Sequence, residues 1–553
     1  MSSGTFALPP PRNEPVLTHA VGLPERIDLA QRLAELAADP PEIPVIVGGK
    51  EVRTGRIAEV RAPHRHAQVL ARVHQAGPAE VEAAAEASVA ARRDWAALAP
   101  HDRASVLLKA ADLVAGPWRA TLNAATMLGQ SKSVQQAEID SACETIDFWR
   151  WNPWFMAQLL AQQPVSSPGV WNRTEYRPLE GFVFALTPFN FTAIGANQPT
   201  APALMGNSVL WKPASTAVLA NWWTLKALHA AGLPPEVISF LPGRGAAVGD
   251  PAIQSRHLGG LHFTGSTAVF NSMWRTIAGN LERYRGYPRI VGETGGKDFV
   301  FVHPSADLEA AAVALVRGAF EYQGQKCSAA SRAYLPRSLW PALRERLVAL
   351  TEALAVGAVE DFSTFCGAVI DQAAFQRIRG YLDHARATPG HRILCGGGCD
   401  DSVGWFVQPT VVETEDPRSR LMSEEIFGPV LTVWVYDDAR LDEAVALCDS
   451  TSPYALTGAI FAQDRRAVAD LTARLTDAAG NFYVNDKPTG AVVGQQPFGG
   501  ARGSGTNDKA GSLLNLVRWT SARTVKETFV PPKVVGYPHQ ELPPPEPPIV
   551  TTG

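Results

Sequence analysis

The chain has 553 residues, of which 46% are hydrophobic, and its formal net charge is −4. This length is enough for more than one α/β domain. A nearly balanced charge without a basic stripe disfavours nucleic acid and anionic membranes as partners. The sequence also lacks an apolar run of about 18 residues, which disfavours a membrane span.

The N-terminal segment and the cysteine content indicate a cytoplasmic protein. The first residues contain no continuous apolar signal core, and acidic residues offset the arginines, which argues against a mitochondrial transit peptide. Six cysteines in a chain of this length do not make a disulfide framework. We therefore expect a reducing, cytoplasmic compartment.

The first half of the chain predicts an arm followed by helices and then an α/β domain. Residues 1–43 are rich in proline and are expected to lie on the body as an arm, and residues 44–163 and 182–298 are expected to form the first domain. Helical spacing occurs in five stretches: Ala79–Leu98, His101–Ala115, Ser133–Phe155, Ala217–Ala231 and Thr267–Ala278. Short apolar runs typical of strands occur at Phe182–Leu186, Ser208–Trp211, Val237–Leu241, Gly260–Phe263 and Arg289–Val291. The alternation of the later runs with helices predicts a parallel sheet with crossover helices.

The second half repeats this alternation, which predicts a second α/β domain over residues 299–490. Its predicted elements are a helix at Leu308–Phe320 and strands at Phe299–Val302, Val430–Tyr436, Gly458–Phe461 and Phe482–Asn485. Two further pieces belong to neither domain: Pro164–Arg177 is a polar excursion, and Leu513–Phe529 has the pattern of a late strand. Residues 531–553 are rich in proline and are expected to be a C-terminal tail.

Cys327 and Glu293 are the candidate chemical groups. Cys327 ends the run Phe–Glu–Tyr–Gln–Gly–Gln–Lys–Cys, and Glu293 lies in Gly–Glu–Thr–Gly–Gly–Lys. A lone cysteine is usually buried and inert, and a lone glutamate beside glycines is usually a turn or cap residue. Together, a thiol that attacks a carbonyl and a carboxylate that activates water are the two halves of acyl-enzyme chemistry. The glycines are expected to give the backbone the freedom to present Glu293, and the ammonium of Lys326 could favour the thiolate if it approaches the sulfur.

Three further patterns are weak evidence of function by themselves. Thr187–Pro–Phe–Asn–Phe191 follows a predicted strand, and an isolated asparagine there would usually satisfy a turn. Thr264–Gly–Ser–Thr267 joins a predicted strand to a predicted helix, so its free N–H groups and helix dipole could bind a pyrophosphate. Cys395 and Cys399 flank three glycines, but no second pair of ligands follows, so no metal site is expected.

The runs around Cys327 and Glu293 resemble the two active-site patterns of the aldehyde dehydrogenase superfamily, over about residues 45–530. The resemblance implies an aldehyde dehydrogenase-like α/β fold: a Rossmann-like cofactor domain and a catalytic thiol domain, each with a parallel sheet, plus a small β oligomerisation flap at residues 164–181 and 512–530. It implies an NAD-dependent enzyme with Cys327 as nucleophile, Glu293 as general base and Asn190 as donor to the oxyanion. Because relatives that pass the acyl group to coenzyme A do not need this base, its presence indicates hydrolysis to a free acid. A homodimer or a dimer-based oligomer is expected.

The resemblance also implies the cofactor contacts. The residues expected to bind the cofactor are Thr187, Lys212, Gly265, Ser266, Thr267, Val269 and Glu425. Lys212 resembles the family's ribose-binding lysine, although most lysines are merely solvated, and Glu425 matches the residue that holds the nicotinamide ribose. Ser215 stands where many strongly NAD-selective relatives have a glutamate, so NAD is favoured while NADP stays open.

A narrower resemblance is to 1-pyrroline-5-carboxylate dehydrogenases, which oxidise L-glutamate γ-semialdehyde to L-glutamate in proline catabolism and so contribute to glutamate biosynthesis. It rests on Cys143–Arg150, Thr187–Ile194, Gln325–Ser328, Thr489–Ala491 and Gln495–Asp508. The substrate residues expected from it are Glu144, Phe191, Lys326, Ser328, Gly490, Ala491 and Phe498.

The chemistry of an amino-acid semialdehyde fits this set. Ser328 and the N–H groups of the Gly490–Ala491 turn could bind the carboxylate without a buried positive charge, and Glu144 could accept from the ammonium. Phe191 and Phe498 would enclose the aliphatic chain. Many relatives have serine where Ala491 stands.

Several alternatives stay open. Asp140, Glu144 and Asp147 share helical spacing and could be one solvated face, and Phe498 could be core packing. The substrate could be another semialdehyde, such as succinate semialdehyde. The chain could also be a binding protein that reuses the fold without turnover.

Overall fold

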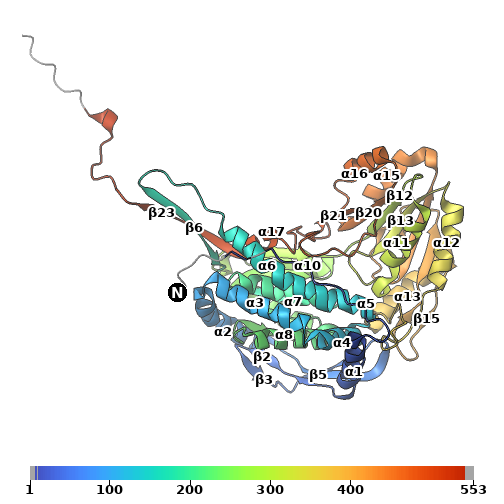
Figure 1. Ribbon diagram of the computed structural model, residues 1–553, viewed down its shortest axis with the longest axis horizontal. Helices are drawn as coiled ribbons and strands as arrows, with labels where there is room; N and C mark the ends of the chain where they lie inside the picture. The colour runs from blue at the N-terminus through green and yellow to red at the C-terminus, as the bar shows by residue number, and fades with distance from the viewer. Residues whose placement is uncertain (1–6, 9, 542–553) are drawn as a thin grey trace, which may run out of the picture.

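The computed structural model describes residues 7–8 and 10–541, so residues 542–553 of the expected tail lie outside the described residues. Figure 1 shows two lobes and a two-stranded ribbon that projects from one of them. Each lobe is built on its own seven-stranded sheet. The expected α/β architecture is confirmed.

The first lobe is centred on a sheet with the strand order β11-β10-β7-β8-β9-β2-β3. Its strands are β2 (Val45–Val47), β3 (Lys50–Val52), β7 (Phe182–Leu186), β8 (Ser208–Lys212), β9 (Ile238–Phe240), β10 (Leu258–Thr264) and β11 (Arg289–Glu293). β11, β10, β7, β8 and β9 are parallel, whereas β2 is antiparallel to β9 and β3. The buried strands β7, β8 and β10 are nearly continuous apolar runs, as parallel strands covered on both faces require.

Helices surround this sheet (Figure 1). They are α1 (Pro24–Ala38), α2 (Pro78–Ala97), α3 (Pro100–Ala115), α4 (Arg119–Gln130), α5 (Val134–Ala137), α6 (Thr145–Leu160), α7 (Thr192–Leu204), α8 (Val218–Ala231), α9 (Gly245–Gln254) and α10 (Thr267–Gly279). A small sheet is formed by β1 (Glu42–Ile43), β5 (Arg65–His74) and β4 (Ile57–Ala62). α2 begins as the Gly–Pro pair predicts, with proline in its first turn and Glu80 accepting from the N–H of Gly77 at 2.7 Å.

The second lobe has the strand order β14-β17-β18-β13-β12-β20-β21. Its strands are β12 (Asp298–Val302), β13 (Ala330–Pro336), β14 (His391–Cys395), β17 (Thr410–Thr414), β18 (Val430–Tyr436), β20 (Thr457–Phe461) and β21 (Asn481–Val484). Its helices are α11 (Leu308–Phe320), α12 (Trp340–Glu352), α13 (Gln372–Ala387), α14 (Arg420–Ser423), α15 (Leu441–Ser450) and α16 (Arg465–Arg474). β14 is antiparallel to β17, and the other pairings are parallel.

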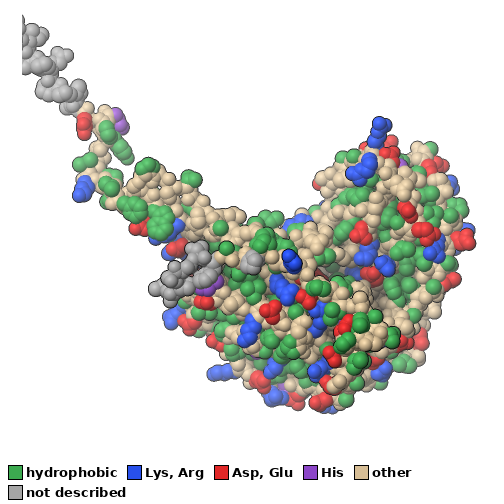
Figure 2. Space-filling model, viewed as in Figure 1, with side chains coloured by type: hydrophobic (Ala, Val, Ile, Leu, Met, Phe, Trp, Pro, Cys, Tyr) green, Lys and Arg blue, Asp and Glu red, His purple; other side chains and the backbone are tan. Residues whose placement is uncertain are grey.

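The projecting ribbon consists of β6 (Val170–Pro178) and β23 (Thr520–Thr528), which pair antiparallel along their whole length. Figure 2 shows hydrophobic side chains along this ribbon and the segment that follows it. The exposed ones are Trp171, Phe529, Val530, Val534, Val535 and Tyr537. The ribbon brings together the two pieces of sequence that fit neither predicted domain.

Three predicted elements differ from the structure. The N-terminal arm contains the helix α1, whose leucines are buried against the body. The predicted strand Leu513–Phe529 begins instead with the helix α17 (Leu513–Arg518), because the hydroxyl of Ser512 caps it by accepting from the N–H of Leu514. The predicted helix Ser133–Phe155 contains a π-helical segment, Glu138–Glu144, between α5 and α6.

No described helix is long and apolar enough to cross a membrane. Within residues 7–8 and 10–541, no group of three or more His, Cys, Asp or Glu side chains is arranged to hold a metal ion.

Candidate active site

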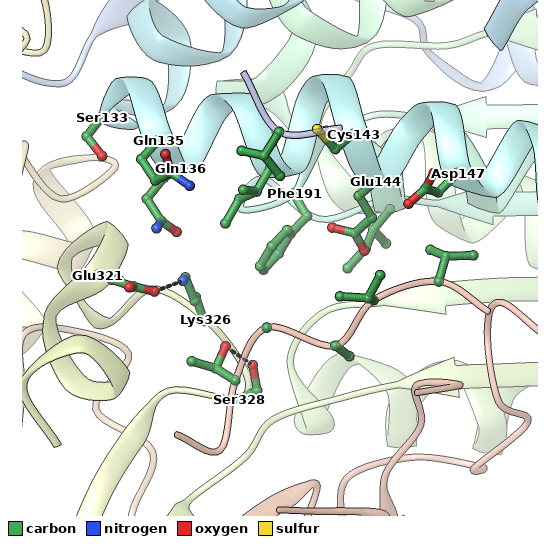
Figure 3. Close-up of a pocket in the computed structure, with 18 of the residues that line it drawn as sticks. Ser133, Gln135, Gln136, Cys143, Glu144, Asp147, Phe191, Glu321, Lys326 and Ser328 are labelled. Atoms are coloured by element: carbon green, nitrogen blue, oxygen red, sulfur yellow. Dashed lines mark hydrogen bonds and ion pairs between the residues drawn. The ribbon is translucent and has the colours of Figure 1, made fainter. Parts of the chain in front are cut away.

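A cavity of about 950 Å³ lies between the lobes, and all seven of the predicted substrate residues line it. Cys327 and Glu293 also line it. Figure 3 shows part of this cavity, with residues of the α5–α6 region on one side and Glu321, Lys326 and Ser328 on the other. The sequence therefore predicted a set of side chains that the fold does bring together.

The loop before Cys327 has a constrained backbone. Tyr322, Gln323 and Gly324 have consecutive positive φ values of 53°, 54° and 65°. Each non-glycine residue in this region costs about 1–3 kcal/mol unless its surroundings enforce it. The enforcing contacts come from the amide of Gln323, which donates to the carbonyls of Ser131 at 2.9 Å and Ala368 at 2.7 Å. The loop that leads to Cys327 is thus fixed by hydrogen bonds to two other parts of the chain.

Cys327 is half-buried and lines the cavity. Burial, with the nearby Glu293, Asp298 and Glu425, raises its pKa well above the usual value, so the resting group is a thiol. The ammonium of Lys326 lies 3.0 Å from Glu321 and is paired with it. Lys326 was expected to favour the thiolate only if its ammonium approached the sulfur; in the structure that ammonium pairs with Glu321.

Glu293 is the last residue of β11, and one of its carboxylate oxygens, Oε2, is buried without a hydrogen-bond partner among the described residues. Burial raises its pKa to about 8; Lys509 opposes this shift and Asp508 adds to it. An unpartnered carboxyl group with a pKa near neutrality is suited to accept a proton from water.

The glycines around Glu293 provide space and not backbone freedom, which corrects the sequence-based interpretation. Gly292, Gly295 and Gly296 do not have positive φ values. A Cβ on Gly296 would lie 2.1 Å from the carbonyl oxygen of Cys327, and one on Gly292 would lie 2.2 Å from the ring of Phe270. Glycine here lets the strand that carries the carboxylate approach the loop that carries the thiol.

Asn190 is buried, and its amide donates to the carbonyl of Gln325 at 3.0 Å. This bond places the amide beside the nucleophile loop, two residues before Cys327. Because a primary amide has two N–H groups, one remains for an oxygen atom bound near the thiol.

The predicted cofactor turn joins β10 to α10. The N–H of Gly265 donates to the carbonyl of Glu293 at 3.1 Å, and a Cβ on Gly265 would lie 2.8 Å from the ring of Phe263. Ser266 caps α10 by accepting from the N–H of Val269, and Thr267 starts the helix. The turn offers N–H groups and the positive end of a 13-residue helix, which fits a pyrophosphate.

The other predicted cofactor residues include Lys212, Glu425 and Thr187, each of which has a hydrogen-bond partner in the structure. Lys212 is buried, its ammonium donates to the carbonyl of Pro213 at 3.0 Å, and burial lowers its pKa to about 8. A buried ammonium with one hydrogen bond has donors left for ribose hydroxyls. Glu425 accepts from the N–H of Gly296 at 2.9 Å, beside Cys327. The hydroxyl of Thr187 accepts from Trp211 at 3.0 Å and so ties β7 to β8.

One end of the cavity is rich in hydrogen-bond donors. Ser328 and Thr489 share a hydrogen bond of 2.8 Å, which joins the nucleophile loop to the Gly490–Ala491 turn. Lys326 is buried here, and Lys487 donates to the carbonyl of Thr489 at 3.2 Å. Ser328 and the turn therefore lie beside two lysines, of which Lys326 is paired with Glu321.

The opposite end is acidic. Glu144 ends the π-helical segment and points into the cavity (Figure 3). Burial and the neighbouring Asp140 and Asp147 raise its pKa to about 8, and Lys132 and Lys326 oppose the shift. Asp140 and Asp147 are themselves buried, so the three carboxyl groups do not form a solvated face. The extra residue per turn of a π-helix re-aims side chains, and such segments often occur at functional sites.

An aromatic wall lies between the two ends. Phe191 precedes α7, and the ammonium of Lys132 lies 4.2 Å from the centre of its ring. Lys132 also pairs with Asp140 at 2.6 Å, and Asp140 accepts from the first two N–H groups of α7. Phe498 is half-buried and lines the cavity, so it is not core packing alone.

The comparison with known families decides the family. A model described as the aldehyde dehydrogenase family matches residues 51–525. The chain belongs to the aldehyde dehydrogenase family. The family resemblance and the enzyme class expected from the sequence are confirmed.

Curated relatives within the aldehyde dehydrogenase family are similar over nearly the whole chain. The chain is 54% identical over 535 residues to the mitochondrial delta-1-pyrroline-5-carboxylate dehydrogenase of Dictyostelium discoideum, covering 96% of each chain. It is 51% identical over 520 residues to the human protein of the same name, covering 94% of this chain and 92% of the human one.

A solved structure is equally similar. The delta-pyrroline-5-carboxylate dehydrogenase of Mycobacterium tuberculosis, bound with NAD, is 53% identical with a TM-score of 0.94, and the match covers 98% of this chain and 100% of that one.

The cavity residues of this aldehyde dehydrogenase that were not predicted from the sequence include two groups. Thr489 and Lys487 lie beside the predicted Gly490–Ala491 turn, and the run Thr–Gly–Ala could have indicated the first of them. The other group, which includes Asn13, comes from the N-terminal arm, where no local pattern marks a site.

Proposed function

We propose that the chain oxidises L-glutamate γ-semialdehyde, the open-chain form of 1-pyrroline-5-carboxylate, to L-glutamate in proline degradation, with NAD as cofactor. The observation that carries this proposal is that the cavity that holds the thiol has hydrogen-bond donors at one end and a carboxyl group at the other. Ser328, Lys487 and the Lys326–Glu321 pair lie at one end, and Glu144 lies at the other. A substrate with a carboxylate and an ammonium on one carbon and an aldehyde at the far end of its chain suits that arrangement.

In the proposed reaction, the thiol of Cys327 gives its proton to water, and the sulfur forms a bond to the aldehyde carbon as the C=O double bond becomes a single bond. The negative charge that develops on the aldehyde oxygen is stabilised by the free N–H of Asn190 and by the backbone N–H of Cys327. One such donor is worth about 3 kcal/mol of barrier. NAD, when bound at the Gly265–Thr267 turn, would accept the hydride from the former aldehyde carbon; as that C–H bond breaks, the oxyanion becomes the carbonyl group of a thioester on Cys327.

The second half of the proposed reaction releases the acid. Glu293 accepts a proton from a water molecule, whose oxygen attacks the thioester carbon on Cys327, and the C–S bond breaks. The unpartnered oxygen of Glu293 and the pKa of about 8 support this role. Water, and not coenzyme A, is the proposed acyl acceptor.

The cofactor proposal is supported by the fit of the turn and of Lys212 to a dinucleotide, and by the NAD found in the Mycobacterium structure. The proposed cofactor residues are those named from the sequence: Thr187, Lys212, Gly265, Ser266, Thr267, Val269 and Glu425. Thr187 would act indirectly on the cofactor, by holding the ends of β7 and β8 together.

The division of the chain and its assembly are also proposals. We assign residues 44–163 and 182–298 to the cofactor domain, residues 299–490 to the catalytic domain, and the β6–β23 ribbon to a flap that joins two subunits. Exposed Trp171 and Phe529 support the flap, because large apolar side chains on a projecting ribbon favour burial against another chain. Six free cysteines support a reducing, cytoplasmic compartment, although several relatives have mitochondrial in their names.

Replacement of the nucleophile tests the enzyme proposal. Cys327→Ala should lower kcat with glutamate γ-semialdehyde and NAD by at least about 10³-fold. Binding of NAD, followed by its effect on intrinsic tryptophan fluorescence, should be retained. A variant that forms NADH at the wild-type rate would refute the proposed nucleophile.

A further inference from the structure

The extended N-terminal segment, residues 10–21, supplies part of the wall of the substrate cavity. Asn13, Glu14 and Val16 line the cavity together with Glu144 and the Gly490–Ala491 turn. The segment has neither helix nor strand, so side-chain contacts must fix its path.

Asn13 makes three hydrogen bonds that join two walls of the cavity. Its amide donates to the carboxylate of Asp147 at 2.8 Å and to the carbonyl of Val493 at 2.7 Å. Its own carbonyl accepts from the amide of Gln495 at 3.0 Å. Asp147 belongs to α6, whereas Val493 and Gln495 follow the Gly490–Ala491 turn, so one side chain connects the helix to the loop.

Neighbouring contacts hold Asn13 in place. The N–H of Glu14 donates to the second oxygen of Asp147 at 2.8 Å. The carboxylate of Glu14 lies between two guanidinium groups, accepting from Arg119 and Arg150 at 2.6 Å each. The N–H of Leu17 donates to the buried carboxylate of Glu138 at 2.9 Å.

These contacts enclose the residue that faces the substrate ammonium. The arm is bonded to Glu138, where the π-helical segment begins, and to Asp147, three residues beyond its end at Glu144. It is also bonded to Val493, two residues beyond the turn assigned to the carboxylate. The two ends of an α-amino acid head group are attached to the same carbon, so their binding sites must keep a fixed separation.

We propose that Asn13 is a positioning residue that fixes the separation between the Gly490–Ala491 turn and the helix that carries Glu144, and that it thereby determines affinity for an amino-acid head group. Asn13 does not touch the reacting atoms. The inference rests on the proposed function, because it assigns the two walls to the carboxylate and the ammonium of one substrate.

Loss of the bridge removes one hydrogen-bond donor from each wall. In Asn13→Ala, the carbonyl of Val493 and one oxygen of Asp147 lose their donor, and both are then free to move toward water. Small displacements of binding groups are costly when two contacts must form at once. In Asn13→Asp the shape is kept, but a carboxylate would stand where the amide now donates to Asp147, so repulsion replaces attraction.

The test compares two aldehydes in the full-length enzyme: glutamate γ-semialdehyde, and butanal, which has no head group. Asn13→Ala should raise KM for glutamate γ-semialdehyde about tenfold with kcat changed less than about twofold. The loss of kcat/KM should be at least about fivefold greater for glutamate γ-semialdehyde than for butanal. Asn13→Asp should raise KM further. Arg12→Ala, an exposed neighbour on the same segment, is the matched control and should match the wild type.

A purely structural role predicts a different result. Equal losses for both aldehydes, or a fall in kcat together with a lower Tm and an unchanged KM, would overturn the inference. An unchanged KM for glutamate γ-semialdehyde in Asn13→Asp would also overturn it. If the wild-type enzyme shows no preference for glutamate γ-semialdehyde over butanal, both the proposed substrate and the role of Asn13 are refuted. If the wild-type enzyme shows the preference and both Asn13 variants keep it, only the role of Asn13 is refuted.

Discussion

Glu144 gives the sharpest test of head-group recognition, and the change is Glu144→Gln. Burial and two neighbouring carboxyl groups raise its pKa to about 8. The free enzyme at pH 7 therefore carries the ionised form in about one molecule in ten. Only the carboxylate pairs with the substrate ammonium, so binding improves as the pH rises through about 8, until the substrate loses its own proton.

The size of the effect follows from two quantities. A hydrogen bond to a charged group contributes about 1.5–3 kcal/mol, which corresponds to a ratio of about 10–150 in kcat/KM between wild type and variant at pH 9. At pH 7, ionising the carboxyl group costs about 1.4 kcal/mol, so this ratio should fall about tenfold.

The assay is initial-rate formation of NADH from glutamate γ-semialdehyde between pH 6.5 and 9. Cyclisation of the substrate also depends on pH, but it affects both enzymes equally and cancels in the ratio. Glutarate semialdehyde, which has the chain and the carboxylate but no ammonium, is the matched control and should give a ratio that does not vary with pH. A ratio for glutamate γ-semialdehyde that is independent of pH, or the same dependence with the control, would refute the reasoning.

Two further predictions concern the chemical groups. Glu293→Gln should slow thioester hydrolysis by about 10²–10⁴-fold. The variant should then give a burst of about one NADH per subunit, and an acyl adduct on Cys327 should be visible by mass spectrometry. The rate of deacylation should rise with pH through about 8 in the wild type but not in the variant. A variant that shows neither burst nor slower turnover would exclude Glu293 as the base. Gly296→Ala should lower kcat about 10²-fold and lower Tm, because the new Cβ would lie 2.1 Å from the carbonyl oxygen of Cys327. The control is Gly279→Ala in α10, whose new Cβ would meet no atom within 4 Å and which should have wild-type activity. Equal activity of the two alanine variants would show that the close approach at Gly296 is unimportant.

Much of the fold could be predicted from local pattern. The strand Phe182–Leu186, the helix Leu308–Phe320 and the strand Val430–Tyr436 have the bounds that the sequence predicts. These are long or continuous apolar elements in which burial and periodicity agree. The sequence does not reveal the helix at the start of Leu513–Phe529, because a helix of six residues is too short to show the helical spacing of apolar residues.

The candidate site was predictable where its residues lie in one short run. Cys327 with Ser328, and Glu293 with its glycines, are each local patterns. The π-helical turn before Glu144 and the pairing of Lys326 with Glu321 depend on tertiary packing, and the sequence does not show them. The same holds for Asn13, whose partner Val493 is 480 residues away.

The proposed function requires the site to select an aldehyde with an amino-acid head group. The most direct measurement is kcat/KM with NAD for glutamate γ-semialdehyde and for succinate semialdehyde under identical conditions. Because only the former has an ammonium to pair with Glu144, the proposed function predicts a preference for it of at least about tenfold. Equal values, or a preference for succinate semialdehyde, would contradict it.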